Sequence, residues 1–329
     1  MAGKALANLT EFSKAIDPAV NIVFDGNFKA AGETYKDICS VGKSDLYQEE
    51  ISSNVGLTMA RLKTEQASLE YESFLQGDNQ VLTQYEYSIG TQITKHLAKF
   101  QRLNQIKGLI ANAGSAIGRR REFDITKLLE RCSATSYTHS IDGSTVIDLT
   151  GGDSLALQSA SHTTMRSATS ISNVIGDGTT SNMDLAEDSL EAAETVTAPA
   201  ITDESDQVVQ YNLSRLFCAR KKSWTAMRLL KTSAGRVGTP NNDVNLIQGR
   251  YALTVLPYMD AAYADYWFLK DDAMNNLPGF MMYLESQGVE KDGPYIDFDT
   301  KGIKYSWSLM AAAGHNEWRS FLCSQGDNT

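Results

Sequence analysis

The sequence predicts an α+β protein in which a few long elements are joined by polar and irregular segments. The stretch "VLTQYEYSI" (residues 81–89) alternates apolar or aromatic residues with polar ones, which is typical of a half-buried strand. A stripe of apolar residues at spacings of three and four follows and predicts a long helix. Near the end, "GIKYSWSLMAAAG" (residues 302–314) alternates again and predicts a second long strand.

Composition limits the classes of function. The chain has 329 residues, 42% of them hydrophobic, which is enough for a sizeable core and typical of a soluble globular protein. Its net charge of -10 argues against high-affinity binding to nucleic acid or to an anionic membrane, and favours protein partners. No apolar run reaches a membrane span, and the first residues lack a signal-peptide core, so we expect synthesis in the cytoplasm and no membrane partner.

The cysteines and histidines predict neither a metal site nor a cofactor site. The 4 cysteines are far apart and form no C-x-x-C pair, so we expect buried thiols. The 4 histidines include no i, i+4 pair and no H-E-x-x-H motif. Glycine-rich stretches such as "VIGDGTTSN" lack the lysine of a phosphate-binding loop, which favours a loop over a nucleotide site.

The first 77 residues carry little apolar periodicity. Residues 1–44 show few patterns beyond "AVNIVF", so we expect an extended arm that relies on something else for its burial. Residues 45–77 are mostly polar, with a weak period of two that favours a long two-stranded flap. A helix over part of this segment is the alternative, because good helix formers occur in it.

The helical stripe begins after Gly90 and ends near Gly118. Its apolar residues are Ile93, Leu97, Phe100, Leu103, Ile106, Ile110, Ala113 and Ile117. At about 1.5 Å per residue, such a helix would be roughly 35 to 40 Å long. We expect Gly118 and the charged "RRREFD" to break it, with Asp124 as the cap of a second piece, "ITKLLERC".

The second half of the chain predicts a mixed unit. Two short strands are expected at "STVIDLT" and "LALQSASH", and the Ser/Thr/Gly-rich loop after them marks a boundary. Beyond it come an acidic helix in "MDLAEDSLEAAETV", a strand in "RLFCAR" and a helix in "SWTAMRLLKT". Strands in "YALTVLP" and "YADYWFLK" complete the unit.

One stretch raises the question of a serine hydrolase. "GGDSLALQSASHTTM" sets Asp153, Ser159, Ser161 and His162 close together in sequence, but a triad must converge in space. If the segment is a strand, both serines share one face and His162 points to the other. No G-x-S-x-G elbow occurs either, so a structural histidine is favoured over a catalytic one.

The chain contains two basic clusters, Arg119-Arg120-Arg121 and Arg220-Lys221-Lys222. One interpretation is that they contact phosphates or an acidic surface on a neighbour. The alternative is that they are solvated helix ends or loops.

The order of the elements resembles that of the major capsid proteins of tailed bacteriophages, with the Hong Kong 97-type fold. "YSIGTQITKHL" is similar to the entry into the spine helix of Mu-like major head subunits, and "DSLALQSASHTT" to the stretch before their Gly/Ser-rich loop. "NLIQGRYALTVLPYMDAAYADYWFLKDD" resembles the family's turn, strand and aromatic strand, with Asn245-Leu246 where Asn-Pro is usual. The resemblance covers roughly residues 80–325.

This resemblance implies a division of the chain. The parts would be an N-terminal arm (1–44), an extended loop over an adjacent subunit (45–76), a peripheral domain with the spine helix (77–182), an axial domain (183–300) and a return strand to the peripheral domain (301–329). The Ser/His stretch would then be a structural connection without catalytic duty.

The resemblance also implies a function. The chain would self-assemble into pentamers and hexamers of an icosahedral shell around viral double-stranded DNA, as a structural protein of the virion made in the host cytoplasm. Scaffold, portal and decoration proteins would be further partners, and the packaged DNA would be contacted non-specifically. The alternatives are an encapsulin-type cargo compartment and, less favoured, a serine hydrolase.

Charge suggests how such subunits meet. The flap is predominantly acidic, whereas the arginine cluster crowds like charges that need a negative partner. We therefore expect flap carboxylates of one subunit to meet the arginines of another, with bidentate hydrogen bonds to Glu49 or Glu50. The candidate intersubunit residues are Glu49, Glu50, Arg61, Lys63, Arg119, Arg120 and Arg121.

Overall fold

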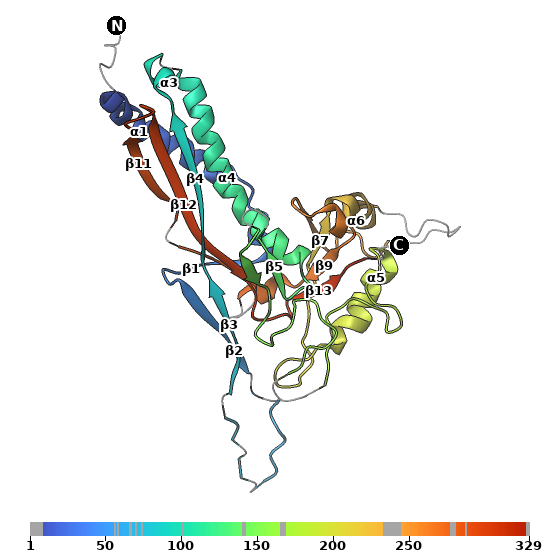
Figure 1. The fold of residues 1–329 in the computed structure, drawn as a ribbon. Coiled ribbons are helices and arrows are strands. Elements are labelled where there is room, and N and C mark those ends of the chain that lie inside the picture. The colour runs from blue at the N-terminus through green and yellow to red at the C-terminus, as the bar shows by residue number, and fades with distance from the viewer. Residues whose placement is uncertain are drawn as a thin grey trace.

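The structure is a computed structural model with an elongated unit of helices and sheet, a smaller α/β unit and a projecting hairpin (Figure 1). This arrangement confirms the predicted α+β class. The residues that it describes are 9–55, 57, 59–65, 68–69, 71–73, 75–100, 102–139, 143–164, 169–232, 245–276, 281–286 and 288–326.

A five-stranded sheet organises the elongated unit. Its strands are β1 (Ser40–Lys43), β4 (Tyr85–Ile93), β10 (Met282–Glu285), β11 (Glu290–Ile296) and β12 (Ile303–Gly314). β12 pairs antiparallel with β4 from Ile303↔Ile93 to Ala311↔Tyr85, and with β11 and β10 along its other edge. The long strand predicted at residues 302–314 is confirmed as β12. The strand predicted at residues 81–89 is divided at Gln84: residues 81–83 end another strand, β3 (Leu75–Thr83), and the rest belong to β4, the neighbour of β12.

Two long helices, α1 (Leu9–Ala30) and α4 (Leu103–Glu130), pack against each other. The ring of Phe24 on α1 stacks on Trp307 of β12, with 4.8 Å between ring centroids, so α1 also covers the sheet. The expectation of an extended arm in residues 1–44 is wrong over this segment, because Phe12, Val20 and Phe24 are buried within the same chain. Pro18 lies inside the helix, and a proline at that position argues against a helix when only the sequence is read.

The predicted break at Gly118 is also wrong, because α4 continues to Glu130. Gly118 serves close packing instead, since a Cβ there would collide with Ala31. The helix begins later than expected: β4 extends to Ile93, and a short helix, α3 (Lys95–Lys99), comes before α4. Asp124 is a buried residue of the continuous helix rather than a cap.

The predicted two-stranded flap is an antiparallel hairpin of β2 (Gln48–Val55) and β3 (Leu75–Thr83), and it projects from the body (Figure 1). Its second strand lies mostly beyond the predicted residues 45–77. The helical alternative is wrong for the described part of the flap. Ile51 and Leu82 pack with Leu284 and Ala312 in a small apolar cluster. This cluster fixes the base of the hairpin to the sheet.

The smaller unit contains a four-stranded sheet in the order β13-β9-β7-β8. Its strands are β7 (Arg215–Ala219), β8 (Ala252–Leu256), β9 (Trp267–Lys270) and β13 (Phe321–Ser324). The strands and the helix predicted between residues 215 and 270 are confirmed. A strand at residues 155–162 is not, because that segment consists of turns and one isolated bridge at His162.

The remaining elements are short. They are α2 (Tyr35–Ile38), β5 (Ser136–Thr138), β6 (Val146–Asp148), α5 (Glu187–Ala192), α6 (Ser223–Lys231), the π-helix η1 (Ala193–Thr197) and the 3₁₀ helices η2 (Ala198–Ala200), η3 (Arg220–Lys222), η4 (Ala261–Tyr263) and η5 (Asp272–Asn276).

Strand pairing differs from the predicted division at two places. β10 and β11 come from residues 183–300, which were assigned to the axial domain, yet they pair in the sheet with β12. β13 comes from residues 301–329, the predicted return strand, yet it pairs with β9 in the smaller sheet. Hydrophobic alternation identifies a strand but carries no information about its partner.

The close crossing of α1 and α4 predicts opposite effects at two glycines of one helix. A Cβ at Gly114 would lie 2.6 Å from the backbone oxygen of Phe24, whereas nothing lies within 4 Å of one at Gly108. Gly114→Ala should therefore destabilise the subunit by about 1–3 kcal/mol. Gly108→Ala should stabilise it by about 0.5–1 kcal/mol through helix propensity. Urea unfolding of both variants checks this, and equal effects would contradict the crossing.

Candidate functional site

The acidic candidates Glu49 and Glu50 lie on β2, at the base of the flap. A carboxylate oxygen of Glu49 accepts a hydrogen bond from the Ser44 hydroxyl at 2.5 Å. Glu50 accepts one from the Asn79 side chain at 2.8 Å, across the hairpin. These bonds hold both carboxylates in place on one strand, and neither joins them to an arginine of the cluster.

The far part of the flap carries the other two flap candidates together with exposed apolar side chains. Arg61 forms an ion pair with Glu72 at 3.6 Å, and Lys63 is exposed. The large apolar side chains left in water here are Leu57, Met59, Leu62, Leu69 and Tyr71. Leu62 is 95% exposed and Tyr71 is 89% exposed, so the chain itself covers neither side chain, and together these residues form an exposed apolar patch.

Arg120 is buried inside the elongated unit, between β4 and α4. It forms an ion pair with Asp124 one helical turn away, and its guanidinium lies 2.5 Å from Nε2 of His139. The same guanidinium stacks over the Tyr87 ring at 4.0 Å from its centroid. Its positive charge is therefore balanced within the chain.

Arg121 is half-buried and has an acid partner of its own. Its guanidinium pairs with both carboxylate oxygens of Glu285 on β10, one of them at 2.6 Å from Nη2. It also lies over the Phe28 ring, 4.3 Å from the centroid, which ties α1, α4 and the sheet together. Strand β10 was not predicted from the sequence, so this partner of Arg121 was not expected.

Arg119, in contrast, is exposed and forms no ion pair with any described residue. The three arginines thus differ: two neutralise acids of their own chain and one faces solvent. The predicted partner contact of Arg120 and Arg121 was based on repulsion between like charges. Acids of the same chain already remove this repulsion, so the two arginines do not require a partner chain. A contact between Arg119 and the Glu49 or Glu50 of another subunit stays a prediction.

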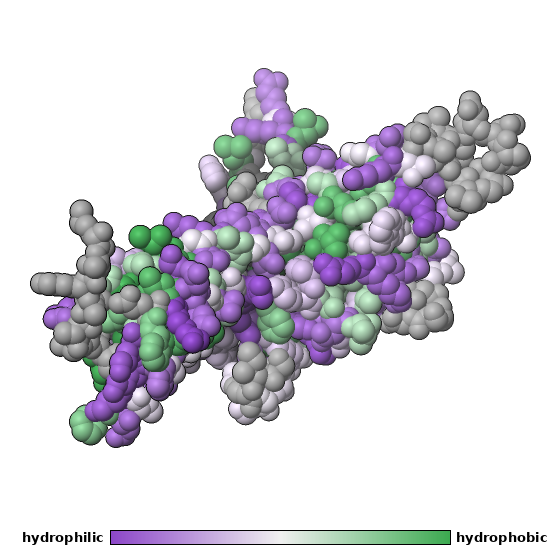
Figure 2. Space-filling model, turned by 90° about the horizontal axis from the view of Figure 1, so that it is seen from above, coloured by the Kyte–Doolittle hydropathy of each residue, from purple (hydrophilic) through white to green (hydrophobic). Residues whose placement is uncertain are grey.

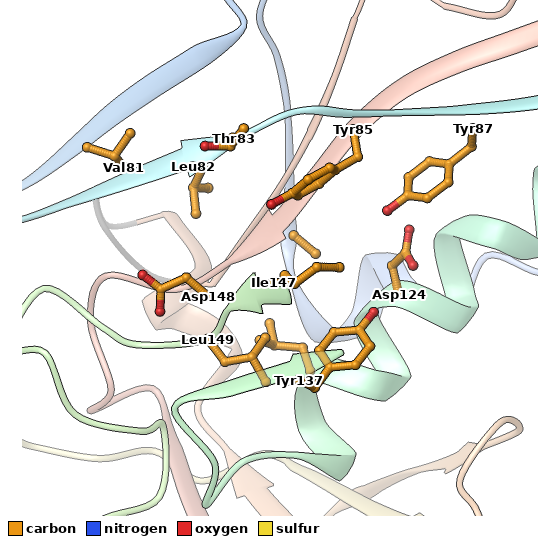
Figure 3. A pocket seen from close by; sticks show the side chains of 12 residues that line it. Val81, Leu82, Thr83, Tyr85, Tyr87, Asp124, Tyr137, Ile147, Asp148 and Leu149 are labelled. Atoms are coloured by element: carbon orange, nitrogen blue, oxygen red, sulfur yellow. The ribbon is translucent and has the colours of Figure 1, made fainter. Parts of the chain in front are cut away.

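A small cavity of about 50 Å³ lies beside Asp124, between β3, β4, α4 and the β5–β6 hairpin. Figure 3 shows the hydroxyl groups of Tyr87 and Tyr137 pointing toward the carboxylate of Asp124. Burial raises the pKa of Asp124 to about 7, although the Arg120 charge favours the ionised form. A sequence reading misses this buried cluster because its members come from β4, α4 and β5.

The Ser/His stretch forms a packing cluster. Nδ1 of His162 lies 2.5 Å from Asp153, and its fully buried ring stacks on Trp318 with 4.0 Å between centroids. Burial raises the pKa of Asp153, but the hydrogen bond and electrostatic interaction with His162, together with the hydrogen bond from the Leu155 backbone, lower the pKa below its usual value. The Ser159 hydroxyl accepts a bond from the Ser161 backbone instead of contacting the imidazole.

His315 is buried in the same packing cluster, next to Asp153. Burial lowers its pKa from 6.5 to about 4, so the ring is neutral in the folded protein near pH 7. The carboxylates of Asp153 and Asp148 favour its charged form, whereas His162 opposes it. Burial therefore dominates the titration of this histidine.

The second basic cluster is largely neutralised by acids of the same chain. Lys221 binds Asp265 at 2.8 Å, and Lys222 binds Asp184 and Asp265. The 4 cysteines are free and buried, as predicted. Among the described residues, no group of three or more His, Cys, Asp and Glu side chains is placed to hold a metal ion. Nor does any helix in the described ranges have the length and apolar character to span a membrane.

Comparisons with known proteins identify the fold. No family model matches the chain, and no curated protein matches it. Among solved structures, the capsid of an empty GTA particle is 12% identical, with a TM-score of 0.51, and the match covers 89% of this chain and 90% of that chain. A chain of Mycobacterium phage Adephagia is 11% identical, with a TM-score of 0.52 and 91% coverage of both chains. One of Mycobacterium phage Cain is 10% identical, with a TM-score of 0.50 and the same coverage. The chain thus has the Hong Kong 97-type α+β fold of phage capsid structures.

Burial of Arg120 predicts a folding defect in the isolated subunit. Arg120→Glu would place a second buried carboxylate beside Asp124 and remove its partner, which should cost about 3–5 kcal/mol. Arg119→Glu, one residue away on the exposed face, should change stability by less than about 0.5 kcal/mol. Urea unfolding of the monomeric proteins measures both. An Arg120→Glu protein as stable as the unaltered chain would contradict the buried pair.

The neutral His315 predicts acid sensitivity. Its folded pKa of about 4 lies below the ordinary value of 6.5, so its contribution is complete above pH 6.5 and is lost as pH falls toward 4. Between pH 6.5 and pH 4 the free energy of unfolding should therefore fall by on the order of 3 kcal/mol more in the unaltered protein than in a His315→Gln variant. The raised pKa of Asp124 has the opposite sign, stabilising the fold as pH falls through 7, but it is common to both proteins and cancels in their difference. Parallel pH profiles for the two proteins would contradict a neutral buried His315.

Proposed function

We propose that this chain is the major capsid protein of a tailed bacteriophage, which self-assembles into an icosahedral shell around double-stranded DNA. The observation that carries the proposal is the flap: within a capsid fold, a hairpin leaves its large apolar side chains in water. A second copy of the chain is the partner that would cover them in a closed shell.

The flap has the properties of an interaction arm. Its base is fixed to its own chain by the cluster around Ile51 and Leu82, so its direction is set before assembly. Full burial of one large apolar side chain contributes about 1.5–3 kcal/mol. Partial burial of five such residues would therefore stabilise each subunit contact by several kcal/mol.

Further apolar patches fit contacts elsewhere on the subunit. On the smaller unit, Trp224 of α6 is 77% exposed and Leu246 is 82% exposed. At the opposite end of the molecule, Phe100 and Phe298 are exposed. Figure 2 shows hydrophobic side chains interrupting a mainly hydrophilic face, including a patch at the end that carries α1 and α3. A subunit with neighbours on several sides needs such separate patches.

The division into capsid domains follows strand pairing in this proposal. The peripheral domain would contain α1, α4 and the sheet around β12, and the axial domain the sheet of β7, β8, β9 and β13. The β2–β3 hairpin would be the extended loop over an adjacent subunit. A closer relationship to Mu-like head subunits rests on the stretch "YSIGTQITKHL", which here leaves β4 and enters α3.

The proposal includes the surroundings of the subunit. It would be made in the host cytoplasm, assemble with scaffold and portal proteins, bind decoration proteins, and contact the packaged DNA without sequence specificity. It would act as a structural protein, because the Asp153–His162 pair is buried against Trp318 and engages neither serine. Residues of the Ser/His stretch then serve the junction between the two units.

Flap variants test the proposal. Leu62→Asp with Leu69→Asp should abolish closed particles while the subunit keeps its stability, because both side chains are exposed in the single chain. Val208→Asp, at a residue of the smaller unit that is 59% exposed like Leu69, serves as the control and should leave assembly intact. Sedimentation and electron microscopy measure the particles.

The same preparations separate the alternatives. Particles of the unaltered protein that contain double-stranded DNA support the viral shell, whereas particles with a protein cargo and no DNA would indicate an encapsulin-type compartment. If the unaltered protein forms only monomers or dimers under all conditions, both the viral shell and the encapsulin-type compartment are refuted.

A further inference from the structure

Charge is unevenly distributed along this acidic chain. Residues 87–121 contain no aspartate or glutamate, although the whole protein has a net charge of -10. Arg120 and Arg121 are neutralised inside the chain, as described above. The other basic side chains of this stretch are exposed and form no ion pair with a described residue: Lys95, Lys99, Arg102, Lys107 and Arg119. We call these five residues the basic helix face.

The basic helix face lies on one side of a two-layer unit. Ile106, Ile110 and Ile117 of α4 are buried, so the exposed positions of the helix face away from the sheet. On α3, His96 stacks on Phe100 between Lys95 and Lys99, which places an exposed aromatic ring among the cations.

The other side of the unit carries the opposite charge. Glu86 of β4 and Glu290 and Asp292 of β11 are exposed, and their registers place them with Met310, Ser308 and Ser306 of β12. Those β12 positions alternate with the buried Trp307 and Leu309, so they lie on the open face of the sheet. Lys304 shares this face, but it pairs with Asp297.

The neighbouring helix α1 does not cancel the basic helix face. Its exposed acids, Glu11 and Asp25, are matched in number by its exposed lysines, Lys14 and Lys29. Asp17 is bound by Lys291 of β11 at 2.5 Å. The helix layer therefore keeps a positive excess, and the sheet layer a negative one.

We propose that the basic helix face contacts the phosphates of packaged double-stranded DNA, so that the helix layer faces the interior of the shell and the open sheet face lies outside. This inference rests on the proposed capsid function. Few cations per subunit give weak, salt-dependent contacts, but repetition over a shell makes them effective, and an otherwise acidic wall limits adhesion.

Lysine labelling of intact DNA-filled particles tests the orientation. An amine-reactive ester attached to a polymer too large to enter the shell should modify Lys304 on the sheet face. It should leave Lys95, Lys99 and Lys107 at least tenfold less modified than in dissociated subunits. Equal modification of these three lysines in intact and dissociated protein would overturn the inference.

Ultraviolet cross-linking of the same particles tests the contact with DNA. Cross-links should map to residues 95–119, and Phe100 is the exposed aromatic expected among them. The triple variant Lys95→Gln, Lys99→Gln, Lys107→Gln should lower their yield at least threefold. A matched variant on η3 and α6, Arg220→Gln, Arg228→Gln, Lys231→Gln, should not.

These outcomes separate this inference from the capsid proposal. Shells that carry their DNA cross-links elsewhere would refute the basic helix face and leave the capsid function intact. Failure of the unaltered chain to form shells would refute the capsid function. If the triple variant does not assemble, the labelling of unaltered particles still decides the orientation.

Discussion

One face of β12 positions the long elements of this protein. Its side chains at Ile303, Tyr305, Trp307, Leu309 and Ala311 are almost completely buried, and α1 and α4 cover the sheet on that side. The edges of the same strand bind β4, β11 and β10, so one twelve-residue strand sets both layers. This packing determines which face of α4 is buried and which is exposed. It therefore also determines which arginines of α4 are buried and which face solvent.

The end of β12 also joins the flap to the smaller unit. In the turn after β12, the side-chain amide of Asn316 donates a hydrogen bond to the backbone oxygen of Asp78 on β3, at 3.0 Å. Arg319 in the same turn pairs with Glu204 at 2.7 Å, and Trp318 stacks on His162. A buried polar junction of this kind couples the direction of the flap to the smaller unit, as the proposed shell with its repeated flap contacts would require.

Local patterns in the sequence identified β12, most of β4 and α4, and three strands of the smaller unit, β7, β8 and β9. They failed where burial is set by tertiary contacts. Phe12, Val20 and Phe24 share a helical spacing, but Pro18 among them argues locally against a helix. Gly118 resembles a helix break in the sequence because its close neighbour, Ala31, is distant along the chain. For the candidate site, the sequence indicated the acidic flap and the arginines. The partners of Arg120 and Arg121 lay on segments whose placement no local pattern records.

In the proposed shell, neighbouring copies of the chain cover the apolar side chains of the flap. A cryo-electron microscopy reconstruction of particles assembled from the purified chain is the decisive experiment. We expect a closed shell in which each β2–β3 hairpin lies over an adjacent subunit and buries Leu62 and Tyr71 there. Particles in which the hairpin leaves these side chains in solvent, or folds back on its own chain, would contradict it.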